Sequence, residues 1–332
     1  MRHEMGSWHP ESPARLQAIE DQLIASRIGT CLEYRQALAA NLADVARVHT
    51  AAAIALVRDN VPQMQSGQAS YFPLDGDTSL NAFSWKAALA AAGAAVAATD
   101  AVIGGEIENA FCSIRPPGHH ARPTEPMGFC LFNNIAIAVR HALEVHGLQR
   151  VAIVDFDVHH GNGTEETFAN EPRVLMTSLF QHPFYPYSGT DSKCINAINI
   201  PLPAGTTGAL VRRLIAEQWL PALHAYRPQM IFISAGFDAH RDDDIGQMGL
   251  LEADYAWITR QIKEIARLYT GGRIVSCLEG GYNLSALGRS VVSHLRVLAG
   301  LDEQKSGVAA ASPAAAAPTG RIFDGRRHNS VQ

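Results

Sequence analysis

Two carboxylates and two imidazoles fall within six consecutive positions of the stretch DFDVHHGNG, residues 155–163. They follow the apolar run VAIV, which has the composition of a buried strand. An unpaired buried charge is costly, or its pKa shifts until the group is neutral. The cluster therefore predicts a partner of opposite charge, and a metal ion is the simplest candidate.

Alternation along an extended chain divides this cluster. With a period of two, Asp155, Asp157 and His159 share one side, whereas His160 faces the other. Asp238, in SAGFDAHRDD, adds a carboxylate at the end of another apolar run, and open α/β sheets bind ligands at such strand ends. We therefore predict Asp157, His159 and Asp238 as ligands of a divalent ion, with a position left open for water as in catalytic zinc sites.

A second histidine pair stands in RPPGHHA, at residues 115–121. Two adjacent histidines cannot easily bind one ion, and Pro116 and Pro117 hold the approach to them extended. A histidine beside a metal-bound water is the usual general base, and a carboxylate behind it fixes its tautomer. The sequence thus favours His119 and His120 for proton transfer, with Asp155 as the supporting carboxylate.

Each motif also has an interpretation without chemistry. A strand-end aspartate is often a helix cap, a histidine pair often lies in a solvated loop, and GFDAH alone fits a turn. Four polar stretches at the ends of apolar runs, including LEGGYN at 278–283, favour one shared site instead. A dinucleotide loop does not fit GNGTEE, because its third glycine would fall at Glu166.

Composition narrows the class of protein. The chain has 332 residues, 47% of them hydrophobic and 18% charged, with a net charge of -5 and no basic stripe, so a globular protein that does not bind nucleic acid is expected. Five scattered cysteines without a CxxC spacing indicate a reducing, cytoplasmic setting. No apolar leader or run of membrane length is evident, so no membrane partner is expected.

The apolar runs alternate with helix-patterned segments. Strands are predicted at 111–114, 151–156, 174–180, 195–200, 230–235 and 273–278, and helices near 13–26, 80–103, 133–146, 207–224, 252–270 and 284–299. This order predicts a doubly wound parallel α/β sheet with helices on both faces. One domain is expected over residues 1–303, followed by an Ala/Pro-rich, disordered tail over 304–332.

Together these motifs resemble the histone deacetylase superfamily, which includes acetylpolyamine amidohydrolases and acetoin-utilisation proteins. The match runs from HPESPARLQAI through RPPGHHA, GFCLFNN, DFDVHHGNGT and SAGFDAHRDD to LEGGYN, over about residues 3–300. RPPGHHA, Asn162 and LEGGY are more similar to the class II and bacterial branch than to class I. The resemblance implies a single arginase/deacetylase-like domain with an eight-stranded parallel sheet.

The resemblance also implies a role for individual positions. The zinc ligands would be Asp157, His159 and Asp238. The catalytic residues would be His119, His120, Tyr282, Asp155 and Asn162. The walls and rim of the substrate channel would include Phe129, Tyr185, Asp77, Ile245, Gly128 and Gly281. A structural monovalent cation, K⁺ or Na⁺, would lie at Asp155 and Ser178.

The function implied is a zinc-dependent deacylase with one Zn²⁺ per chain, acting on acetyl-lysine or a related N-acyl amine. An acetylpolyamine amidohydrolase is the first alternative; an isoleucine, Ile245, in place of an acidic rim residue favours acyl-lysine over it. A manganese ureohydrolase and a non-catalytic acyl-lysine binding protein are further alternatives. The expected partners are an acylated lysine peptide or protein or a small acylated amine, with a homo-oligomer left open.

Overall fold

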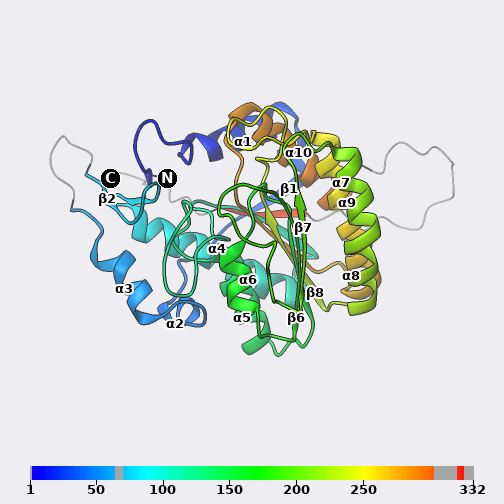
Figure 1. Ribbon diagram of the computed structural model, residues 1–332, viewed down its shortest axis with the longest axis horizontal. Coiled ribbons are helices and arrows are strands. Elements are labelled where there is room, and N and C mark those ends of the chain that lie inside the picture. The colour runs from blue at the N-terminus through cyan, green and yellow to red at the C-terminus, as the bar shows by residue number, and fades with distance from the viewer. Residues whose placement is uncertain (1, 64–69, 303–319, 325–332) are drawn as a thin grey trace.

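A parallel sheet forms the centre of the molecule (Figure 1). The computed structural model describes residues 2–63, 70–302 and 320–324. The sheet has eight strands, in the spatial order β1 (Leu32–Gln36), β10 (Gly320–Asp324), β4 (Asn109–Ser113), β9 (Ile274–Leu278), β8 (Met230–Ala235), β5 (Val151–Asp155), β6 (Val174–Gln181) and β7 (Ala197–Leu202). A small antiparallel pair, β2 (Phe72–Pro73) and β3 (Ser79–Leu80), stands apart.

Helices cover both faces of the sheet, and Figure 1 shows α7–α9 on one side and α4–α6 on the other. The first face carries α1 (Ala14–Ala25), α7 (Gly208–Leu214), a π-helical turn (Ile215–Trp219), α8 (Leu220–Tyr226), α9 (Glu252–Tyr269) and α10 (Leu284–Leu298). The second carries α2 (Leu42–Val45), α3 (Ala51–Asp59), α4 (Ser84–Ile103), α5 (Asn134–Glu144) and α6 (Asn162–Phe168). A short 3₁₀ turn, Ile28–Cys31, precedes β1.

The four central strands, β4, β9, β8 and β5, are buried at every position and mostly apolar, because helices cover both of their faces. In β8, Ile231 and Ile233 pack into the core under α9 and α10, whereas Met230 and Phe232 pack into the core under α4 and α5. Alternating residues of β5 divide between the same two cores. A strand covered on both sides cannot show the polar alternation of a half-exposed strand.

The chain order brings four strand ends together. The chain runs from β4 to β5, adds β6 and β7 outward, and then returns to place β8 and β9 between β5 and β4. The four neighbours β4, β9, β8 and β5 are all parallel, so their carboxyl ends open at one edge. These are the strands that the four polar stretches follow.

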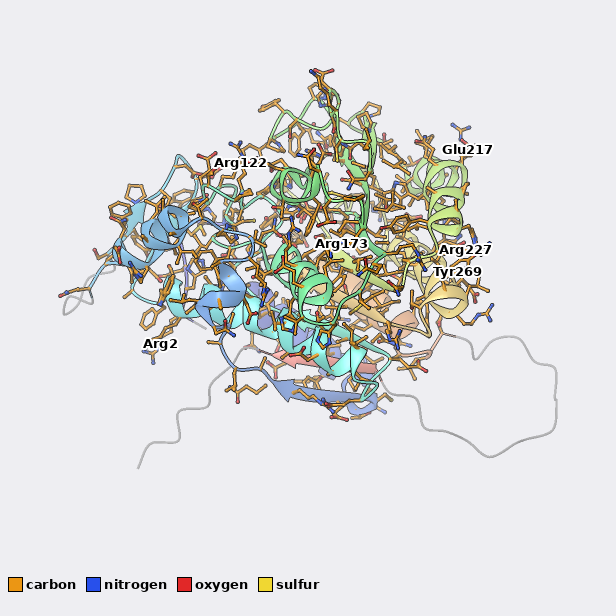
Figure 2. All side chains as sticks on the ribbon, turned by 90° about the horizontal axis from the view of Figure 1, so that it is seen from below. Arg2, Arg122, Arg173, Glu217, Arg227 and Tyr269 are labelled. Atoms are coloured by element: carbon orange, nitrogen blue, oxygen red, sulfur yellow. The ribbon has the colours of Figure 1, made fainter. Side chains whose placement is uncertain are left out.

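The α/β class and the helices on both faces are confirmed, and all six predicted strands occur within about two residues of their expected ranges. Four described strands are not among those predicted: β1 and β10 of the large sheet, and the separate pair β2 and β3. The predicted tail needs correction, because Gly320–Asp324 lies inside the sheet between β1 and β4. Figure 2 shows this strand, in red, beside the blue β1. The remainder of the predicted tail, 304–319 and 325–332, lies outside the described residues.

One helix, α4, is long and apolar enough to match a membrane span by length and composition alone. The expectation that no run reaches that length therefore needs correction. Within the domain, 67% of its most apolar window is buried, where it packs against the sheet and α5. The same composition suits the core helix of a folded domain.

Candidate active site

The three predicted metal ligands meet at the carboxyl edge of the sheet. Asp157 and His159 follow β5, and Asp238 follows the neighbouring β8. His159 Nδ1 lies 2.9 Å from Asp157 Oδ1 and 3.3 Å from Asp238 Oδ2. One ligand atom from each residue lies within 4.8 Å of the others, and all three side chains are buried. The structure therefore forms the cluster that the sequence predicted.

The surroundings hold this cluster open for an ion. Gly280 N donates to Asp157 Oδ2 at 2.8 Å, and Val158 N donates to Asp238 Oδ1 at 2.9 Å. Asp238 Oδ2 is buried and has no hydrogen-bond partner in the described part of the chain. A Cβ at Gly280 would lie 1.9 Å from this oxygen, so only glycine leaves the necessary space. Two carboxylates, one imidazole and an unsatisfied buried oxygen fit a divalent cation.

The tandem histidines have different supports. His119 Nδ1 lies 3.0 Å from Asp155 Oδ2, and His120 Nδ1 lies 2.8 Å from Asn162 Oδ1. Both partners are oxygen atoms that accept hydrogen bonds, so each ring carries its proton on Nδ1 and leaves Nε2 available. The Nε2 atom of His119 lies 3.8 Å from Asp157 Oδ1, facing the metal ligands.

The pKa values of His119 and His120 shift in opposite directions. Burial lowers the pKa of His119, but the Asp157 and Asp155 carboxylates outweigh burial and raise the pKa to about 10. Burial lowers the pKa of His120 well below its usual value, and the positive charges of His119 and His159 lower it further.

The helices behind the pair fix its backbone. Asn133 caps α5 by accepting from Ala136 N at 2.9 Å, and its amide nitrogen donates to Ala121 O at 3.2 Å. Thr164 N, in α6, donates to His119 O at 3.1 Å. A Cβ at Gly163 would lie 2.3 Å from Ala121 O, so glycine permits this close approach. Two helix starts thereby position the tandem histidines.

Tyr282 lies on the loop after β9. Its backbone N–H donates to Asp243 Oδ2 at 2.7 Å, and the Arg15 guanidinium lies 4.9 Å from the centre of its ring. Burial raises the pKa of the phenol well above its usual value; Arg15 lowers this pKa, and the Asp238 and Asp157 carboxylates raise it further. The phenol is therefore held protonated, as a hydrogen-bond donor requires.

The two aromatic residues predicted for the channel walls lie against the catalytic side chains. The Phe129 ring meets the Tyr282 ring edge to face, with centroids 5.8 Å apart, and Tyr185 meets His120 in the same way at 5.3 Å. Gly128 and Phe129 both adopt positive φ, 56° and 66°. A Cβ at Gly128 would lie 2.6 Å from the His120 ring, so glycine is required where the chain turns beside the catalytic pair.

The residues predicted for the rim of the channel, unlike the metal ligands, do not form one cluster in the structure. Asp77 is exposed, and Tyr185 responds to its charge: burial raises the pKa of the Tyr185 phenol and Asp77 raises it further. Gly281 adopts φ 117° and accepts from Arg15 Nε at 2.7 Å, so it supports the tyrosine loop. Ile245 is half-buried, and its N–H donates to Asp243 Oδ1 at 3.0 Å. Neither observation places the Ile245 side chain relative to a substrate, and its position on the rim stays a prediction.

The predicted monovalent-cation residues are neighbours across β5 and β6. Asp155 pairs with Ser178 in the sheet register. Ser178 Oγ is buried without a hydrogen-bond partner in the described residues, and Asp155 Oδ1 accepts from Asp157 N at 3.1 Å. An unsatisfied hydroxyl beside a buried carboxylate fits a cation of low charge.

Sequence reasoning missed several groups that shape the site. Glu279 Oε2 accepts from Gly118 N at 2.7 Å and from His119 N at 3.1 Å, and burial raises its pKa to about 7. Phe184 stacks on His159 at 5.2 Å. Glu279 directly follows an apolar strand, and this is the same signal that marked the metal ligands. Asp243 and Arg15 act through long-range contacts that no local pattern reveals.

Comparison with known proteins agrees with this geometry. Residues 9–298 match the model of the histone deacetylase domain. The chain is 38% identical to a probable deacetylase of Archaeoglobus fulgidus, over 91% of this chain and 84% of the relative. It is 36% identical to a histone deacetylase-like amidohydrolase of Pseudomonas aeruginosa, over 83% and 73% respectively.

A solved structure, that of the HDA15 HD domain, superimposes with a TM-score of 0.81 at 33% identity, covering 90% of this chain and 84% of that one. The family model covers most of the chain and includes every residue of the candidate site. The chain therefore belongs to the histone deacetylase family of hydrolases.

Proposed function

We propose that this protein is a zinc-dependent deacylase that hydrolyses the linear amide of an acylated lysine. The observation that carries the proposal is the buried set Asp157, His159 and Asp238, with its unsatisfied oxygen, placed directly beside the tandem histidines. Zinc bound there would supply a Lewis acid and lower the pKa of water. The remaining chemistry belongs to residues of the chain.

The tandem histidines would move the protons. Because Asp155 and Asn162 accept from the two Nδ1 atoms, both Nε2 atoms are turned away from these supports. One imidazole of the pair takes a proton from the attacking water, and the pair later protonates the leaving amine. The partners of the two Nδ1 atoms differ, a carboxylate at His119 and an amide oxygen at His120, so the two imidazoles are not equivalent.

Tyr282 would donate its phenolic proton in a hydrogen bond to the carbonyl oxygen as negative charge develops. Asp243 and Arg15 hold the loop and the ring, so the donor is oriented before substrate arrives. A donor fixed in advance is worth more than one that must reorganise during the reaction.

The aromatic side chains beside the catalytic residues favour an acyl-amine substrate with an alkyl chain. Phe129 and Tyr185 offer aromatic faces to an alkyl chain, which suits the side chain of an acylated lysine. A second candidate substrate, an acetylpolyamine, is favoured by the acidic residues of the predicted rim. The negative charges of Asp77, Asp75 and Glu125 all raise the pKa of the Tyr185 phenol. A cationic polyamine would be attracted to such a rim.

A substrate panel tests the proposal. Zinc-loaded protein would be assayed on acetyl-lysine peptides, longer acyl-lysine peptides, acetylpolyamines and arginine, each with and without a chelator. We expect chelator-sensitive turnover of acyl-lysine peptides. Faster turnover of acetylpolyamines would move the assignment to the second candidate. Urea release from arginine, or turnover unaffected by chelator, would contradict a zinc deacylase.

A further inference from the structure

A second group of metal-ligating side chains lies at the far end of α5 from the tandem histidines. Asp100 lies on α4, His141 on α5, and His146 just beyond the end of α5. Both imidazoles converge on one carboxylate oxygen: His141 Nε2 lies 2.8 Å and His146 Nε2 lies 2.6 Å from Asp100 Oδ1. The three ligand atoms lie within 4.8 Å of one another, the separation that one bound ion would require.

The backbone fixes the spacing of the two histidines. Val145 N donates to His141 O at 2.9 Å, and His146 N donates to the same oxygen at 3.4 Å. The two rings meet edge to face with centroids 5.2 Å apart. Helices α4 and α5 pack through a shared apolar core, which holds Asp100 opposite them. Two of the three ligands thus lie on packed helices, and the third, His146, lies on the bend directly after α5.

His141 also has the support expected of a metal ligand. Its Nδ1 atom lies 3.3 Å from Asp44 Oδ1, so the ring is held between two carboxylates. Asp44 is itself buried and held by Asn41, whose Nδ2 donates to Asp44 Oδ2 at 2.6 Å, and Arg47 contacts the other oxygen. A carboxylate on the second nitrogen fixes the tautomer and raises the basicity of a ligating histidine.

The cluster is partly open to solvent. His141 is buried, whereas the side chains of His146 and Asp100 are 25% and 51% exposed. Water can therefore complete a coordination shell that the protein fills with three ligands. Two imidazole nitrogens and one carboxylate suit a borderline ion such as Zn²⁺, Co²⁺ or Ni²⁺ better than Mg²⁺ or Ca²⁺.

We propose that Asp100, His141 and His146 bind a divalent transition-metal ion of the zinc class, separate from the candidate active site. The ion would replace the protons now shared between the imidazoles and Asp100, and it would join α4 to the end of α5. The competing interpretation is a hydrogen-bonded cluster that holds protons alone. The two differ in metal content, and this proposal does not depend on the deacylase assignment.

Metal content measures the difference. Full-length protein would be dialysed against buffered micromolar free zinc, and zinc per chain determined by elemental analysis for the unsubstituted protein, His146→Ala and Asp157→Asn. We expect two, one and one ions respectively, and none in the double variant. Asp44→Asn should keep the second ion but bind it about 10–100-fold more weakly.

His224→Ala provides a matched control. His224 is an exposed histidine whose Nδ1 bonds the Tyr269 hydroxyl at 2.9 Å, and Figure 2 shows Tyr269 on the α8–α9 side of the molecule. This variant should retain both ions. Equal zinc content in His146→Ala and the unsubstituted protein would overturn the second site. Loss of one ion in His146→Ala, with none lost in Asp157→Asn, would support the second site and contradict the catalytic one.

Discussion

The two histidine–carboxylate clusters of this protein use the same residue types in opposite environments. At the carboxyl edge of the sheet, Asp157, His159 and Asp238 are all buried, and one carboxylate oxygen has no hydrogen-bond partner in the described chain. At the end of α5, two of the three ligands reach solvent, and both imidazoles already bond Asp100.

The difference lies in what each cluster can do without an ion. In the α5 cluster the imidazoles already form hydrogen bonds with Asp100, and two of the side chains reach solvent. The structure of this region therefore need not depend on a bound metal. The buried cluster holds two carboxylates against one imidazole, and its burial leaves too little solvent to offset the cost of the unbalanced charge. Burial thus makes an ion necessary at one end of the molecule and optional at the other, and four substitutions test this contrast.

Asp157→Asn should have the largest effect. The amide is a weaker ligand than the carboxylate, and it also loses the charge that acts on His119 and His159. We expect loss of the bound ion and a fall in turnover of more than about 1000-fold, because the activated water is lost with the metal. Metal analysis and single-turnover assays measure both. Retained zinc with normal turnover would remove Asp157 from the ligand set.

Tyr282→Phe should come next, with a fall in kcat of about 100- to 1000-fold and unchanged zinc content. The phenyl ring preserves the contact with Arg15 and the packing against Phe129, so only the donor is lost. Steady-state kinetics alongside metal analysis separate the two quantities. Turnover equal to that of the unsubstituted protein would show that the phenol takes no part.

Asp155→Asn should reduce turnover by about 10- to 100-fold while zinc stays bound. Asp155 orients His119 and faces Ser178, but it lies behind the ligands rather than among them. Turnover and zinc content should therefore be measured side by side in Asp155→Asn and Asp157→Asn. Equal loss of zinc in both variants would mean that the two aspartates form one undivided metal cage.

His146→Ala should have the smallest effect on catalysis, with turnover within about twofold of the unsubstituted protein, because the two clusters share no partner. The same variant is expected to lose the second ion. A large fall in turnover would show that the clusters are coupled through α5, whose first residues brace the tandem histidines. Measuring thermal stability in parallel would separate such coupling from partial unfolding.

Much of the fold and the centre of the site could be predicted from sequence, because central parallel strands are apolar runs and the residues that follow them are polar. The residues of DFDVHHGNG separate as parity predicted: Asp157 and His159 meet Asp238, while His160 bonds Ser188 and Glu165 away from them. His160 therefore lies apart from the three predicted ligands, on the side that the alternation predicts.

The rest depends on contacts that local patterns do not encode. Strand β1, LEYRQ, has one buried residue and four that are exposed or half-buried, so its composition is that of a surface segment. Strand β10 lies within an Ala/Pro-rich stretch that is typical of disorder. Asp243 and Tyr282 are 39 positions apart and follow the paired strands β8 and β9, and the α4–α5 cluster joins Asp100 to histidines 41 and 46 positions further along the chain.

The position of β10 has a consequence for how the chain matures. Within the described residues β1 joins the other strands of the sheet through β10, and β10 follows all of those strands in the chain. During synthesis, therefore, β1 is made before the other strands of the sheet, and its neighbour β10 follows only after all of them. A chain stopped before Gly320 would leave both β1 and one side of β4 without their hydrogen-bonding partner, an open edge that invites aggregation.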